Sequence, residues 1–224
     1  MSRFKQSFYQ RVYLGADFDA LKYWPEGFSL CVIKSLWNAF QNLQLRYGDL
    51  SKFIDKDTLQ PERTLTREHA LELSRLSIET IWIVEHEADE FETTSTDGSK
   101  PPSYDIGFTL RFGRTDIIWP CEAKMLWTSN SLAAYFSDLE KYRSCVAAPF
   151  SPAGAIVGYL VEGNPEEFFE AFSKTYNIPL NSENGYGELS LRHSDHTRSV
   201  PSGKNYVEDF RCHHLVCTLK SESD

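Results

Sequence analysis

The sequence predicts an α/β protein with a mixed central sheet flanked by helices, and two observations lead to this class. Some segments repeat their apolar residues at helical spacing, whereas others alternate strictly or stay apolar over the length of a strand. The two kinds of segment are interleaved in the order helix, helix, hairpin, helix, strand, helix, strand. Such interleaving is typical of a sheet with helices packed on it.

The composition is that of a globular protein. Of the 224 residues, 41% are hydrophobic and 25% charged, so we expect one domain spanning 1–224 with a sizeable core. No apolar run approaches the ~18 residues of a membrane span, and MSRFKQSFYQ lacks the apolar core of a signal peptide. We therefore expect a cytoplasmic protein that does not contact a membrane.

Charge and cysteine content exclude further classes. The formal net charge of −9 argues against a general nucleic-acid coat, because phosphate binding normally requires a basic surface, although a local basic patch remains compatible with it. The five cysteines form no CxxC pair, which argues against a structural zinc site and favours buried, reduced thiols.

The first half of the chain predicts two amphipathic helices. Apolar residues recur at helical spacing over 28–47, and a second helix is expected over 64–90 with Thr66 as its N-cap. Within this second helix, one row is acidic or polar and is spaced by sevens, which places its members on one face: Glu72, Glu79 and His86.

The period then changes to that of a strand. Residues 105–112 alternate between apolar and polar, Gly113-Arg114 supplies a turn, and 116–124 form the returning arm of a β-hairpin. Pro120 has no N–H to donate, so it predicts an edge strand or a bulge in this arm.

The rest of the chain predicts alternating helices and strands. We expect a helix over 130–148, a strand buried on both faces over 153–161, and a short helix beginning at Pro165. A looser segment contains RHSDHTR, and a last strand covers 213–219. His193 and His196 are spaced as HxxH, which could bind a metal, but no further ligand supports that role, so a contact with a substrate or partner is the favoured interpretation. His213 and His214 lie at the start of the last strand.

The stretch DIIWPCEAK carries the strongest indication of chemistry. Glu122 and Lys124 are two residues apart on a strand and so share a face, and a hairpin closed near 112–115 brings Asp105 beside them. Two carboxylates at one place favour a hard divalent cation, to which the backbone carbonyl of Ala123 could add a ligand. Such a site suits phosphodiester hydrolysis, with Lys124 orienting a water or stabilising the developing anion.

On these residues the sequence resembles a known family. SYD at 103–105, followed by EAK at 122–124 on the second arm of a hairpin, is similar to the PD-(D/E)XK nuclease superfamily, which is also called restriction-endonuclease-like. The order helix, hairpin, helix, strand also resembles the core of that fold. The resemblance covers about 65–162, which would leave 1–60 as an N-terminal helical extension and 165–224 as a C-terminal extension.

The resemblance implies a function and a cofactor. It implies a nuclease that depends on Mg²⁺ or Mn²⁺ and hydrolyses DNA, acting in a restriction or anti-phage defence system. Asp105 and Glu122 would be its metal ligands and Lys124 its catalytic lysine. The family pattern also implies an acid from the preceding helix, for which Glu79 fits best, with Glu72 and Glu87 as rivals.

Other residues and functions stay open at this stage. Four basic residues on the hairpin and on the following helix are candidates for phosphate contacts, the alternative being solvated surface positions: Arg111, Arg114, Lys141 and Arg143. The charged trio itself has an alternative interpretation as a solvated ion pair at a strand end, worth ~0–1 kcal/mol. The net charge and the many aromatic residues also suit a non-catalytic binding or assembly subunit, with a protein partner or a second copy of the chain.

Overall fold

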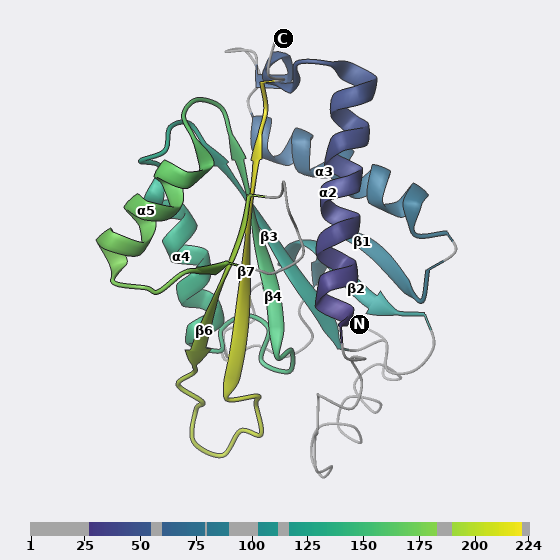
Figure 1. Cartoon of the computed structure of the whole chain (residues 1–224). Helices are drawn as coiled ribbons and strands as arrows, with labels where there is room; N and C mark the ends of the chain where they lie inside the picture. The colour runs from purple at the N-terminus through teal and green to yellow at the C-terminus, as the bar shows by residue number, and fades with distance from the viewer. Residues whose placement is uncertain are drawn as a thin grey trace.

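A mixed seven-stranded sheet forms the centre of the computed structural model, which describes residues 27–54, 60–78, 80–89, 103–111, 117–182 and 190–220. The strands lie in the order β1-β2-β3-β4-β7-β6-β5 (Figure 1). Their bounds are β1 Trp82–Asp89, β2 Ser103–Leu110, β3 Ile118–Leu126, β4 Ala153–Leu160, β5 Asn181–Ser182, β6 Leu191–Thr197 and β7 Asp209–Thr218. The three central strands, β3, β4 and β7, run parallel, and the strands on either side of them pair antiparallel.

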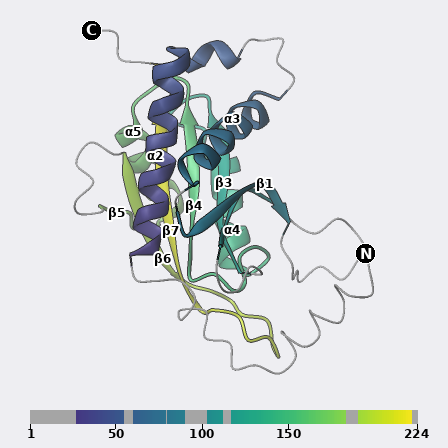
Figure 2. The same ribbon diagram turned by 90° about the vertical axis from the view of Figure 1, so that its right-hand side faces the viewer.

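Helices cover both faces of this sheet. The helices α2 (Phe28–Tyr47) and α3 (Pro61–Leu76) pack on one face, and α4 (Leu132–Arg143) and α5 (Pro165–Tyr176) on the other (Figure 1). A view turned by 90° has α2 and α3 in front of the strands (Figure 2), and a short 3-10 helix, η2 (Leu50–Ile54), follows α2. The predicted α/β class with a mixed, helix-flanked sheet is therefore confirmed.

The core consists of two apolar layers, one on each face of the sheet. On one face, the buried stripe of α2, which includes Ile33, Leu36 and Phe40, packs against the sheet. On the other, Tyr135 of α4 and Phe172 of α5 form part of the second layer. Strand β4 is buried along its whole length, as its continuous apolar run predicts, because helices cover both of its faces.

The helix predicted over 64–90 is wrong in its second half. Helix α3 already ends at Leu76, and residues 82–89 form the edge strand β1, paired with β2. The exposure of this segment alternates strictly, with Trp82 and Ala88 buried and the intervening odd-numbered positions exposed. Its polar outer face has the spacing of a strand, because successive side chains point to opposite faces.

Two further expectations need correction. The segment RHSDHTR is not loose but forms most of β6, which pairs along its length with β7. Pro120 lies in an interior strand rather than at an edge, because β3 pairs with β2 on one side and β4 on the other. The predicted turn at 113–114 lies outside the described residues.

Pro120 fits an interior strand because of the register of its neighbours. The ladder between β3 and β4 begins only at Cys121, opposite Ala155, so Pro120 has no hydrogen bond to β4 to lose. Gly154 lies beside it, and a Cβ at Gly154 would come within 2.8 Å of the Pro120 ring and 2.9 Å of its carbonyl oxygen. The absence of a side chain at Gly154 thus lets β4 approach β3 two residues before Glu122.

We expect Gly154→Ala to destabilise the protein by about 1–3 kcal/mol, because the added methyl group overlaps backbone that has nowhere to move. Urea unfolding followed by circular dichroism measures the change. Ala134→Ser, on an exposed position of α4, serves as the control and should cost only about 0.5 kcal/mol, the difference in helix propensity. Equal stability of Gly154→Ala and the wild-type protein would contradict this close approach of β3 and β4.

Candidate functional site

The site forms where β2 and β3 separate. The antiparallel ladder between them runs from Thr109 and Ile118 to Ile106 and Cys121 and stops there, one step before Asp105 and Glu122 would pair. Beyond this point the Asp105 carboxylate replaces the ladder, and its Oδ2 accepts a hydrogen bond of 2.7 Å from the backbone N–H of Ala123. The hairpin thus brings Asp105 beside the EAK segment, as its alternation predicts.

A second carboxylate continues along the same edge of β3. Glu62, in the first turn of α3, accepts a hydrogen bond from the backbone N–H of Met125 at 2.9 Å through its Oε2. Its Oε1 lies 3.2 Å from Lys124 Nζ. Two acids from different elements therefore satisfy the amides that β2 leaves without partners, which matters because an unpaired buried N–H is costly.

Helix α4 contributes the third carboxylate around Lys124. Asp138 is almost fully buried, and its Oδ2 lies 3.2 Å from Lys124 Nζ, while its Oδ1 lies 2.6 Å from Lys141 Nζ. Lys124 is thus held between Glu62 on one side and Asp138 on the other. The ammonium group is fixed by two elements that belong to opposite layers of the fold.

The electrostatics of the two central acids are unusual. Burial, and then the neighbouring Asp105 and Asp138, raise the pKa of Glu122 well above its ordinary value. Burial also raises the pKa of Asp105, although the Ala123 N–H and Lys124 oppose the shift. An additional positive charge would stabilise the ionised form of both carboxylates, because burial and neighbouring like charges disfavour that form.

Lys124 behaves in the opposite way. Burial alone would lower its pKa, but Asp138, Glu62 and Asp105 outweigh burial and raise the pKa above its ordinary value. The lysine therefore keeps its proton at neutral pH. It can act as a fixed positive charge, but it is a poor proton acceptor.

The cluster as a whole has an excess of negative charge. With every group ionised, two ammonium groups face four carboxylates, which leaves two negative charges in excess: Lys124 and Lys141 against Glu62, Asp105, Glu122 and Asp138. One divalent cation would neutralise this excess. The donor set thus suits such an ion in charge and in its preference for oxygen ligands.

The number of side-chain ligands is small. Among the described residues, no group of three or more His, Cys, Asp or Glu side chains is placed to hold a metal ion. Mg²⁺ commonly binds through only one or two carboxylates and keeps several waters, so Asp105 and Glu122 are compatible with it. The Ala123 carbonyl lies on the same edge of β3 as the N–H that Asp105 binds, since both groups of a strand residue point to one side.

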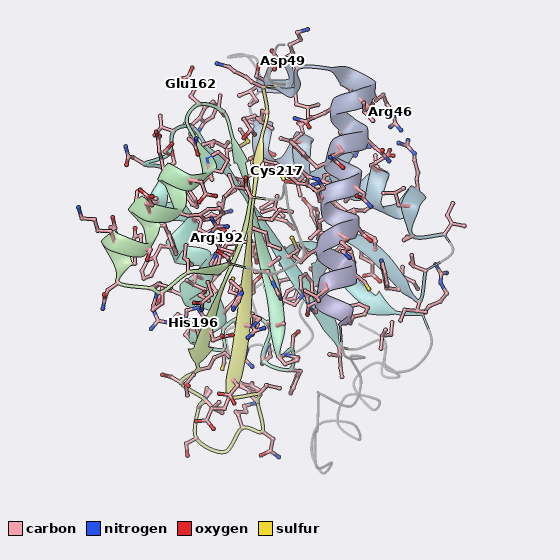
Figure 3. All side chains as sticks on the ribbon, viewed as in Figure 1. Arg46, Asp49, Glu162, Arg192, His196 and Cys217 are labelled. Atoms are coloured by element: carbon pink, nitrogen blue, oxygen red, sulfur yellow. The ribbon has the colours of Figure 1, made fainter. Side chains whose placement is uncertain are left out.

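The helix acid expected from the sequence is not the one that reaches this cluster. Glu79, the preferred candidate, lies outside the described residues. Glu72 on α3 instead forms ion pairs with Arg75 and with Arg46 of α2, the latter labelled in Figure 3, each at 2.8 Å. Glu87 belongs to β1 rather than to a helix, and its carboxylate pairs with Arg63 at 2.7 Å.

Glu62 and Asp138 were therefore missed as members of the site. The signal for Glu62 is the proline before it, since proline is favoured at the first position of a helix and would have placed Glu62 in the first turn. For Asp138 the signal is weaker. It is an acid on the buried side of an amphipathic helix, a position that normally requires a charged partner.

The four expected phosphate-binding residues differ in their surroundings. Lys141 lies at the cluster, paired with Asp138. Arg143 pairs instead with Glu140 at 2.5 Å on its own helix. Arg111, at the other end of β2 from Asp105, donates to the carbonyls of residues 77, 80 and 82, and so ties the end of α3 to the sheet. Arg114 lies outside the described residues.

The histidines do not gather at this cluster. His213 and His214 of β7 are buried. The His214 ring lies 3.1 Å from the Tyr135 hydroxyl and 2.8 Å from the Ser194 hydroxyl, which in turn lies 2.7 Å from His196. His196, labelled near the end of β6 in Figure 3, lines a surface pocket at that end of the sheet. This polar chain satisfies groups buried between β6, β7 and α4.

Comparisons with known proteins gave no match: no family model matches the sequence, and neither a curated protein nor a solved structure is significantly similar to it. The function must therefore be inferred from the site itself. In the part of the chain that the structure describes, no helix is both long enough and apolar enough to cross a membrane.

The raised pKa of Glu122 has a consequence for stability. The folded protein binds the Glu122 proton more tightly than the unfolded chain does, so this group costs stability as the pH rises above its unfolded value of 4.5. In EDTA at pH 8 we expect Glu122→Gln to be more stable than the wild-type protein by about 1 kcal/mol, or about 2–4 °C in Tm. The difference should shrink toward pH 5.

Thermal unfolding at both pH values measures this effect, with Glu170→Gln on the exposed face of α5 as the control for the same chemical change. Adding Mn²⁺ should raise the Tm of the wild-type protein and leave that of Glu122→Gln unchanged. A Glu122→Gln protein that is less stable at pH 8 than the wild type would contradict the charge excess.

Proposed function

We propose that this protein is a divalent-metal-dependent nuclease that hydrolyses phosphodiester bonds of DNA. One observation carries the proposal: Asp105, Glu122 and the Ala123 backbone meet at the point where β2 and β3 separate, with the Lys124 ammonium fixed on the same strand. The negative charge excess supports a metal ion at this point. The neighbouring fixed ammonium supports a substrate that is an anion.

The arrangement of elements supports a restriction-endonuclease-like core. The expected order of helix, hairpin, helix and strand is present as α3, β2–β3, α4 and β4, and β1 adds a third antiparallel strand to the hairpin. The acid contributed by the preceding helix would be Glu62, at the start of α3, since it is the α3 acid that reaches the lysine.

Each residue would have a distinct part in the reaction. Asp105, Glu122 and the Ala123 carbonyl would hold Mg²⁺ or Mn²⁺, an ion that acidifies a bound water and stabilises negative charge on a phosphate oxygen. Lys124 keeps its proton, so its role would be to stabilise the negative charge that develops on the phosphate in the transition state. Glu62 and Asp138 are positioning residues that hold the Lys124 ammonium in place.

We expect Lys124→Ala and Glu122→Gln each to reduce Mn²⁺-dependent cleavage of DNA by about 100-fold or more, because each removes charge stabilisation of the transition state. Cleavage of a labelled DNA is followed on a denaturing gel, with EDTA as the metal-free control. Lys174→Ala, on the exposed part of α5, removes a lysine far along the chain from the site and should cut like the wild-type protein. Undiminished cutting by Lys124→Ala, with wild-type unfolding behaviour, would rule out this role for Lys124.

A second function is favoured by a separate surface. Large apolar side chains are exposed around the end of α3 and the start of the edge strand β1: Leu71, Leu76, Ile78, Ile81 and Ile83. Single exposed apolar residues are ordinary, but a group beside an edge strand of the described sheet is typical of an interface. This surface supports the alternative function, a non-catalytic binding or assembly subunit.

Light scattering after size-exclusion chromatography tests this alternative. Assembly through this surface predicts a species larger than the 25.7 kDa monomer, which Ile81→Lys should return to a monomer because a charge would be buried in the contact. Leu45→Lys, at an exposed position on α2, is the matched control. A wild-type protein that is monomeric at all concentrations tested would exclude self-assembly through β1.

A further inference from the structure

A pocket of about 410 Å³ lies directly beside the proposed active site, between the start of α3 and the end of β3. Its walls come from two short stretches of the chain, one before and in the first turn of α3 and one at the end of β3: Gln60, Pro61, Glu62, Arg63, Met125 and Trp127. A volume of this size is sufficient for a small organic group. We refer to it as the Trp127 pocket.

Trp127 is the most informative residue of this pocket. Its neighbour Leu126 is fully buried, yet Trp127 is 51% exposed. A tryptophan left this open forgoes much of the hydrophobic gain of its large surface, and exposed aromatic side chains of this kind are common where proteins bind ligands. Met125, which is buried, adds a polarisable thioether to the same pocket.

The pocket and the proposed active site share a residue. Glu62 lines the Trp127 pocket, and its carboxylate binds both Lys124 Nζ and the Met125 backbone N–H. Lys124 lies near the end of β3, and Trp127 follows directly after the strand, so three residues of chain separate them by at most about 10 Å. A group in the pocket is therefore close to a phosphate held at Lys124.

The chemistry of the lining selects a flat, apolar and uncharged group. Trp127, Met125 and Pro61 offer apolar surfaces, whereas the charges of Glu62 and Arg63 are opposite in sign and each is already engaged, Glu62 with Lys124 and Arg63 with Glu87. Gln60 adds an amide that can hydrogen-bond to the edge of a planar ring. A nucleobase has both the apolar faces and the polar edge that this lining fits.

We propose that the Trp127 pocket holds an unpaired nucleobase next to the phosphodiester that is cleaved, with the base stacked on the Trp127 indole. The identity of the ligand rests on the proposed nuclease function. A base within a duplex is stacked on both faces and cannot enter, so the base must be single-stranded or turned out of the helix. The substrate class is therefore DNA that is single-stranded, or opened, at the cleavage site.

Binding without cleavage tests this proposal. Fluorescence anisotropy in EDTA compares a labelled single-stranded DNA with an otherwise identical strand in which abasic sugars replace the bases. We expect Trp127→Ala to weaken binding of the normal strand by roughly 10-fold, the effect of losing one stacked base, and to leave binding of the abasic strand unchanged. Trp127→Phe should keep most of the affinity, since it retains an aromatic face.

Leu45→Ala, at another exposed apolar position, is the matched control and should not affect either strand. Thermal unfolding confirms that the Trp127 variants are folded, which is expected because the side chain is half exposed. Equal losses on the normal and abasic strands, no loss on either, or a wild-type protein that binds both strands alike would each overturn the proposal.

The outcome separates this proposal from the nuclease function. If binding of bases depends on Trp127 but no metal-dependent cleavage occurs, base binding in the Trp127 pocket is supported and the nuclease function is refuted. If cleavage requires Lys124 but DNA binding does not depend on Trp127, the nuclease function is supported and base binding in the Trp127 pocket is refuted.

Discussion

The separation of β2 from β3 after Ile106 and Cys121 is the constraint on which the rest of the site depends. It leaves the amides of Ala123 and Met125 without a strand partner in a largely buried place, where an unpaired N–H would be costly. The fold satisfies them with the carboxylates of Asp105 and Glu62. The acids thus have a structural role, and that role gathers negative charge at the end of one strand. The hydrogen bonding of the Ala123 and Met125 amides therefore produces a cluster suited to a cation.

This solution has an electrostatic cost that the fold only partly offsets. Glu122 is buried among like charges, and its raised pKa records the penalty. Lys124 and Lys141 compensate part of the excess, but both are tied to Asp138. A buried cluster left short of positive charge is unfavourable for stability alone, and perturbed titratable groups of this kind concentrate at functional sites. The ion of the proposed function would complete the cluster and remove this imbalance.

How much of the fold and of the site could be predicted from the sequence depended on how clearly the residues of each element distinguish its buried face from its exposed face. Alternation over 105–112 placed Asp105 opposite the EAK segment, because the register of a hairpin with one buried face is strongly specified. The sequence does not distinguish β1 from a helix, because its outer positions, including Glu85 and Glu87, carry charges that also fit the polar face of a helix. The helix predicted from residue 64 begins at Pro61 instead, so Glu62 falls outside the prediction. The contact of Glu62 with Lys124 also joins residues 62 positions apart in the chain. The polar residues of β6 suggest an exposed and loose segment, whereas Ser194 is buried through hydrogen bonds to two histidines.

An acidic chain can bind a nucleic-acid substrate if the binding free energy comes from short-range contacts. A net charge of −9 opposes the long-range attraction and counterion release that dominate binding by basic proteins. Binding must then come from short-range terms, which the proposed site supplies in two forms. A cation at Asp105 and Glu122 would attract one phosphate, and stacking on Trp127 contributes free energy that does not depend on net charge. Both act only at close contact, so an acidic nuclease of this design would discriminate by the local structure of the strand at the cut rather than by affinity for the DNA backbone in general.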